Sequence, residues 1–142
     1  GTGKKSLVTL FTNLAAKHHN ISFTHTFDER LARRIYAGAD VMLVPSKFEP
    51  CGLTQMIAMR YGTLPLVRKT GGLADTVVDG STGFVFNRYT RTALLTRMRE
   101  VIDAYHQKPA PWQTMMTRVM CQDFSWKHQA GKYVELYQKL LG

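Results

Sequence analysis

The chain has 142 residues, of which 44% are hydrophobic and 20% are charged, as expected for a soluble globular protein with a packed core. Its apolar runs are too short to cross a membrane and residues 1–20 show no signal-peptide pattern, so we expect no membrane partner. The net charge of +9 favours anionic partners, but the basic residues are dispersed and not interleaved with aromatic ones. We therefore expect no nucleic-acid partner, whereas a nucleotide could use the same charge locally.

The first predicted elements alternate between helix and strand. They are a helix capped by Ser6, a strand at 21–25, a helix capped by Asp28, a strand at Val41–Val44, a helix opened by Gly52 and a strand at 64–67. Such alternation is typical of a parallel sheet with right-handed crossovers. The predicted fold class is therefore α/β, with a Rossmann-like parallel sheet and flanking helices.

The second half of the chain is predicted to hold one more strand and three helices. A polar loop at 72–82 precedes a strand at 83–86, and helices follow at 92–106, at 112–120 and after a cap at Ser125. Apolar residues recur along all three helices with helical spacing, which predicts that they belong to the core. Gly62 stands where a left-handed helix end is needed.

Residues 41–72 organise the rest of the chain. A loop after the strand at Val41–Val44 holds Glu49, and Gly52 and Thr54 then begin a helix. A helix that starts beyond the carboxyl end of a parallel strand presents free N–H groups and a positive dipole end, which suit a phosphate. Glu49 would then lie where a sugar attached to that phosphate sits. Taken alone, a single loop glutamate also fits a solvated residue, and Arg68 and Lys69 fit either the site or an exposed strand end.

The two cysteines, Cys51 and Cys121, form no CxxC pair and have no histidine at zinc-ligand spacing. This is the pattern of a reduced, cytoplasmic protein. Cys51 precedes a helix start that can lower a thiol pKa, although a small packed residue is the simpler interpretation.

The string PSKFEPCGLTQMIAMRYGTLPLVRKTGGLADTV at 45–77 resembles the signature of bacterial glycogen synthases and plant starch synthases. STGFVF and DFSWKHQAGKYVELYQKLL fit the same family, so the resemblance covers essentially the whole chain. It implies a two-Rossmann-domain (GT-B type) glycosyltransferase, with residues 1–142 as an incomplete C-terminal nucleotide-sugar-binding domain. The implied activity is retaining transfer of glucose from ADP-glucose to the non-reducing end of an α-1,4-glucan, without metal or cofactor. The implied location is the cytoplasm, or the plastid if the source is a plant.

The resemblance also implies roles for individual residues. Glu49 would be the catalytic residue that faces the donor sugar. Donor binding would fall to Phe27 beside the base, to Cys51, Gly52, Leu53 and Thr54 along the diphosphate, and to Thr70, Gly71 and Gly72 near the sugar and phosphate.

The chain also departs from the family pattern. Ile57 stands where related glycosyltransferases place a second glutamate, and we interpret it as a packing residue. The family's Arg and Lys that clamp the diphosphate would precede Gly1, as would the first strands of the domain. We therefore expect a fragment whose sheet has a gap or re-pairs, and which needs the rest of the enzyme or a partner chain. The alternative is a non-catalytic nucleotide-binding or assembly module with the same fold, and the choice between ADP-glucose and UDP-glucose stays open.

Overall fold

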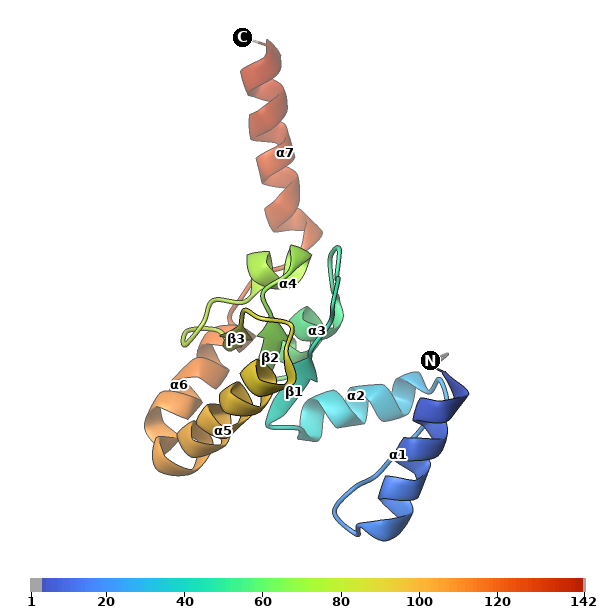
Figure 1. The fold of residues 1–142 in the computed structure, drawn as a ribbon. Coiled ribbons are helices and arrows are strands. Elements are labelled where there is room, and N and C mark those ends of the chain that lie inside the picture. Colours follow the sequence, from blue (N-terminus) through green and yellow to red (C-terminus); the bar gives the residue numbers. More distant parts are fainter. Residues whose placement is uncertain (1–3, 142) are drawn as a thin grey trace. The chain divides into compact units, whose positions relative to one another are not determined.

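The computed structural model describes residues 4–141 and divides the chain into two compact units, Gly1–Arg33 and Arg34–Gly142. The assignment of residues 1–142 to one domain stays a prediction. Within the described residues the elements are α1 (Lys5–Lys17), α2 (Glu29–Gly38), β1 (Val41–Val44), α3 (Thr54–Arg60), β2 (Leu64–Arg68), α4 (Gly71–Thr76), β3 (Phe84–Phe86), α5 (Arg91–Gln107), α6 (Pro109–Met120) and α7 (Trp126–Leu141) (Figure 1).

The first unit contains α1 and a segment that the sequence predicted wrongly. Residues 21–25 form no strand. Instead, Phe23 stacks on Phe11 of α1, with ring centroids 5.6 Å apart. A strand requires a neighbour for its backbone groups, and within residues 4–141 the sheet pairs only the other three predicted strands. The cap at Asp28 is confirmed, because its carboxylate accepts the N–H of Leu31 at 3.0 Å.

The second unit is built on a parallel sheet in the order β1-β2-β3, so the predicted Rossmann-like α/β class is confirmed. Helices α3, α4 and α6 pack against β2, and α5 packs against β3. The central strand is buried from Leu64 to Val67, as expected for a parallel strand covered on both faces. The three strands are neighbours, so no gap separates them. Among the described residues, β1 and β3 each pair on one side only.

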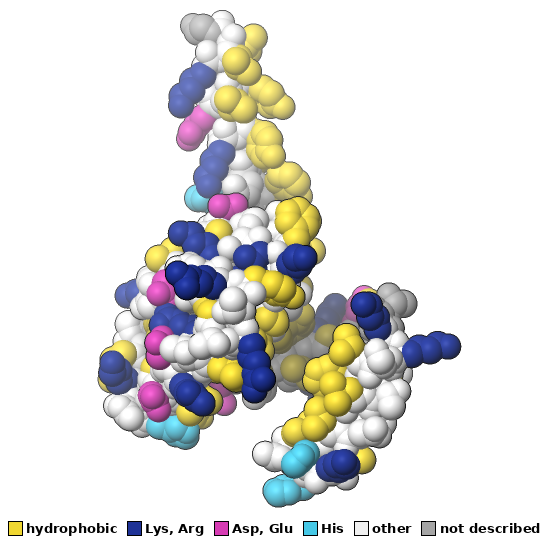
Figure 2. All heavy atoms as spheres, viewed as in Figure 1, with side chains coloured by type: hydrophobic (Ala, Val, Ile, Leu, Met, Phe, Trp, Pro, Cys, Tyr) yellow, Lys and Arg dark blue, Asp and Glu magenta, His cyan; other side chains and the backbone are white. Residues whose placement is uncertain are grey.

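The predicted apolar stripes have different outcomes in different helices. The stripes of α5 and α6 reach the core through Val101, Trp112, Met115 and Val119, and the Trp112 ring stacks on Phe84 at 5.7 Å. The stripe of α7 was predicted to be core, and this is wrong: none of its described residues is buried. Figure 2 shows its hydrophobic side chains along one side of the helix.

One helix was missed altogether. Residues Gly71–Thr76 form α4 inside the segment predicted to be a polar loop. Its single buried residue, Leu73, supplies too little apolar periodicity to reveal a helix of six residues. The predicted left-handed helix end is confirmed at Gly62, where φ is +85°.

We predict that Leu66→Ala in β2 lowers the free energy of unfolding by about 2–5 kcal/mol, because the removed atoms leave a cavity in the core. Leu66 is 2% exposed, whereas its register partner on β1, Leu43, is 39% exposed. Leu43→Ala is therefore the matched control, with an expected loss of about 1 kcal/mol. Chemical denaturation measures both, and equal losses would contradict this description of the core.

Candidate functional site

Two loops meet at the carboxyl edge of the sheet, where ligands bind in open α/β folds. The first follows β1 and comprises residues 45–53; we call it the Glu49 loop. The second follows β2 and comprises Thr70 and the first two residues of α4, Gly71 and Gly72; we call it the glycine turn. Because β1 and β2 are parallel neighbours, both loops leave the sheet at the same edge.

The glycine turn lies directly against the backbone of the Glu49 loop. The N–H of Gly72 points at the carbonyl oxygens of Glu49 (3.2 Å) and Pro50 (3.3 Å) and donates to both. A Cβ on Gly72 would overlap the carbonyl oxygen of Cys51, and one on Gly71 would overlap that of Glu49. Glycine is required here because backbone packs on backbone, which leaves no space for a side chain.

Arg68 holds the other end of the Glu49 loop. Its Nε donates to the carbonyl oxygen of Ser46 at 2.7 Å, and its Nη2 donates to that of Lys47. The guanidinium also lies over the ring of Tyr89, 5.5 Å from its centroid. The sequence left the role of Arg68 open, since nothing in its local pattern shows that the side chain reaches back across 22 residues.

The Glu49 side chain is half-buried, and its Oε2 accepts a hydrogen bond from the Ser46 hydroxyl at 3.3 Å. Gly52 has φ +73°, so the chain turns there and α3 begins two residues later, at Thr54. The amides of Gly52, Leu53 and Thr54 have no acceptor among the hydrogen bonds of residues 4–141. The loop thus presents a carboxylate and free N–H donors within a few residues.

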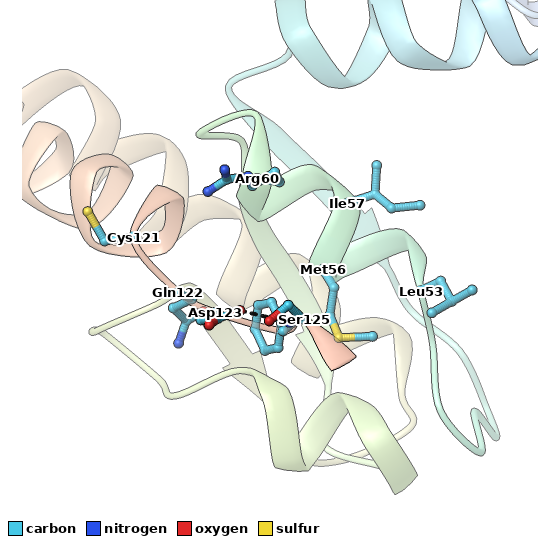
Figure 3. Close-up of a pocket in the computed structure, with 9 residues that line it drawn as sticks. Leu53, Met56, Ile57, Arg60, Cys121, Gln122, Asp123 and Ser125 are labelled. Carbon is cyan, nitrogen blue, oxygen red and sulfur yellow. Dashed lines mark hydrogen bonds between the residues drawn. The ribbon is translucent and has the colours of Figure 1, made fainter. Parts of the chain in front are cut away.

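Two cavities adjoin the start of α3. One, of about 520 Å³, is lined by Leu53, Met56, Ile57 and Arg60 of the α3 region and by residues 121–125 (Figure 3). The other, of about 590 Å³, is lined by Cys51 and Gly72 among others. Ile57 lines the first of these cavities and is 40% exposed, so its packing role stays a prediction.

The structure brings together the predicted residues of the Glu49 loop, the start of α3 and the glycine turn. Phe27, the predicted neighbour of the base, lies in the first unit and is 87% exposed. Its role therefore stays a prediction. Within residues 4–141, no group of three or more His, Cys, Asp or Glu residues could hold a metal ion. In the same range, no helix is long and apolar enough to span a membrane.

Among the carboxylates of residues 4–141, only that of Asp123 has a pKa that is clearly shifted. Asp123 lines both cavities. The neighbouring Ser125, through its hydroxyl first and its N–H second, holds the pKa of Asp123 below its ordinary value. The N–H of Ser125 lies 2.8 Å from Oδ1. The ionised form therefore fixes the turn that leads into α7.

The parallel sheet and the two loops packed together at its carboxyl edge place the chain in a class of α/β folds. In this class, ligands bind at that edge of the sheet. Residues 1–113 match the model of the family described as Glycosyl transferases group 1, and the chain belongs to this family.

Relatives of known type support the same family. The glycogen synthase of Thermodesulfovibrio yellowstonii is 53% identical over 82% of this chain and 23% of that protein. The glycogen synthase of Deinococcus radiodurans is 54% identical over 88% of the chain and 28% of that protein. The chain thus spans about a quarter of the length of these two relatives.

Two solved structures share the fold. The catalytic domain of starch synthase IV from Arabidopsis thaliana, bound to ADP and acarbose, matches with a TM-score of 0.85 and 35% identity. The match covers 95% of this chain and 29% of that one. Sucrose-phosphate synthase from Thermosynechococcus elongatus matches with a TM-score of 0.68 and 25% identity, over 94% and 33% of the two chains.

We predict that Gly72→Ala lowers the free energy of unfolding by about 1–3 kcal/mol or more, because the added methyl group displaces the backbone of Cys51. Gly131→Ala in α7 is the matched control, since its Cβ would meet nothing within 4 Å and alanine favours a helix. Thermal unfolding compares the two, and amide NMR shifts report whether residues 49–52 move. An unchanged loop in the Gly72 variant would contradict the backbone contact.

We also predict that Ser125→Ala raises the pKa of Asp123 towards its ordinary value, because the Ser125 hydroxyl, the largest cause that lowers this pKa, is lost. In the unaltered chain the folded pKa lies below the unfolded one. Its contribution to stability is therefore present above the unfolded pKa and is lost as the pH falls through the folded pKa. A ¹³C NMR titration of the Asp123 carboxyl measures this, with Ser81→Ala as the control. An equal pKa in the Ser125 variant would refute the assignment.

Proposed function

We propose that the whole protein transfers glucose from ADP-glucose to the non-reducing end of an α-1,4-glucan with retention, and that residues 45–72 hold the donor. One observation carries the proposal: the Glu49 loop packs against the glycine turn at the carboxyl edge of a parallel sheet. The glycogen synthases among the relatives, at 53% and 54% identity, favour this activity.

The free amides of Gly52, Leu53 and Thr54 are suited to the diphosphate of the donor, because N–H groups at a loop-to-helix turn bind anions. The match to a starch synthase that was bound to ADP supports a nucleoside diphosphate as the ligand. Thr54 adds a hydroxyl, and Thr70 with the glycine turn would approach the sugar and phosphate. Phe27 would flank the base.

Glu49 would act on the reacting carbon. As the bond from the anomeric carbon to the phosphate oxygen breaks, its electrons leave with ADP, and the amides take up the charge. The sugar becomes oxocarbenium-like, and the Glu49 carboxylate stabilises that positive charge. The acceptor hydroxyl then forms the new bond on the same face and passes its proton to the phosphate oxygen that has just left the anomeric carbon. The Ser46 hydroxyl, 3.3 Å from Oε2, keeps the carboxylate oriented.

Several sequence-based expectations remain predictions within this proposal. They are the absence of a metal or cofactor from the reaction, the absence of nucleic-acid partners, and a cytoplasmic location, or a plastid if the source is a plant. The alternative of a non-catalytic nucleotide-binding module is distinguished by experiment: it predicts that the whole protein binds ADP-glucose without transferring glucose.

We predict that Glu49→Gln in the whole protein lowers the turnover number by roughly two to three orders of magnitude, because the stabilising charge is lost while the shape is kept. Glu100→Gln on α5 is the matched control, since Glu100 pairs with Arg97 at the surface and should leave turnover within about twofold. Glucose transfer from radiolabelled ADP-glucose to glycogen measures both. Near-normal turnover of the Glu49 variant would end the assignment.

A further inference from the structure

A buried glutamine lies directly beneath the site. Gln55 is the second residue of α3, and its side chain is fully buried although it is polar. We infer that Gln55 and Thr76 are positioning residues that fix the Glu49 loop to the glycine turn and so set the geometry of donor binding. This inference rests on the proposed function, since it names residues that act on the same site.

The inference begins from a chain of hydrogen bonds. Gln55 Nε2 donates to the carbonyl oxygen of Gly52 at 2.6 Å and to the hydroxyl of Thr76 at 3.0 Å. The Thr76 hydroxyl donates in turn to the carbonyl oxygen of Gly72 at 2.7 Å. A third carbonyl oxygen, that of Cys51, lies 3.4 Å from Nε2. Two side chains thus connect the end of the Glu49 loop to the glycine turn.

Two contacts assign the nitrogen end of the Gln55 amide, and the buried Oε1 at its other end has no hydrogen-bond partner among the described residues. The atom nearest the carbonyl oxygen of Gly52 must be a donor, because two acceptors at 2.6 Å would repel each other. The Thr76 hydroxyl spends its single proton on Gly72, so it can only accept from Gln55. A carboxylate of the same shape could not replace this amide, because it has no proton to donate to either partner.

Gln55 also explains why position 52 is a glycine. A Cβ built on Gly52 would lie 2.6 Å from Gln55 Oε1, and the residue has φ +73°. The glutamine therefore fills the space where a side chain at position 52 would lie. The bare backbone of Gly52 is left beside the free amides that the proposed function assigns to the diphosphate.

Because of this arrangement, we expect Gln55 and Thr76 to affect the binding of the sugar donor and not the binding of the glucan acceptor. The hydrogen bonds end on Gly52, whose N–H is one of the free amides, and on Gly72, whose N–H donates to the carbonyl oxygen of Glu49. A displacement of about 1 Å at such a site can cost roughly a hundredfold in rate. Loss of the pair should therefore weaken donor binding and turnover together, while the affinity for glucan is kept.

The experiment compares Gln55→Glu, Thr76→Val and Thr76→Ser in the whole protein, with Thr63→Val as the matched control. Thr63 is buried, and its hydroxyl oxygen lies 2.5 Å from the carbonyl oxygen of Tyr36 and 2.8 Å from that of Ala39, so its single proton is donated to this pair, away from both loops. Thr63→Val therefore makes the same chemical change as Thr76→Val, and each variant removes a hydroxyl that bonds to backbone. The readouts are kcat, the KM for ADP-glucose, the KM for glycogen, and the unfolding temperature.

We expect Gln55→Glu and Thr76→Val to lower kcat/KM for ADP-glucose by roughly 10- to 100-fold, with an unchanged KM for glycogen. Thr76→Ser keeps the hydroxyl and should restore activity to within about threefold of the unaltered protein. Thr63→Val should lower the unfolding temperature and leave both KM values unchanged. If Gln55 and Thr76 were purely structural, their variants would lose kcat in step with stability and would keep both KM values. That result would overturn the inference.

A second readout does not depend on activity. In the 142-residue chain, the side-chain NH₂ of Gln55 should exchange slowly with solvent and lose that protection in Thr76→Val but not in Thr63→Val. Rapid exchange in the unaltered chain would overturn the inference whatever the enzyme does. An unaltered whole protein that fails to transfer glucose would instead contradict the proposed function, while the exchange data would still decide whether the pair exists.

Discussion

The site depends on a contact between two stretches of bare backbone. Gly72 donates its N–H to the carbonyl oxygens of Glu49 and Pro50, and neither Gly71 nor Gly72 leaves space for a Cβ. This contact is possible because β1 and β2 are parallel neighbours whose following loops leave the sheet at one edge. Everything that the proposed function asks of Glu49 and of the free amides follows from the position that this contact gives them.

Side chains then hold each end of the Glu49 loop. Arg68 takes the carbonyl oxygens of Ser46 and Lys47 at the beginning, and Gln55 with Thr76 takes that of Gly52 at the end. The guanidinium of Arg68 and the amide of Gln55 are suited to holding the loop, because the carbonyl oxygens that they bind have no backbone partner among the described residues and these groups offer several N–H donors. The Glu49 carboxylate thus lies in a loop that is fixed on both sides, as a preorganised site requires.

The sequence predicted the local features of this arrangement well and its long-range contacts poorly. The strand at Val41–Val44, the cap at Asp28 and the left-handed Gly62 each follow from a pattern within a few residues. The strand expected at 21–25 failed because strand formation depends on a partner elsewhere in the chain. The apolar stripe of α7 was a correct sign of an amphipathic helix, but periodicity cannot say what covers the apolar face. Gln55 gave no sequence signal, since a polar residue in a helix is usually exposed.

The most direct test of the central claim is an NMR titration of the ¹⁵N-labelled 142-residue chain with ADP-glucose. The account predicts that amide shifts change together in the two segments that the backbone contact joins, residues 49–54 and 70–72, and that they saturate along one binding curve. Changes confined to scattered basic residues elsewhere on the chain, or to one segment without the other, would contradict it.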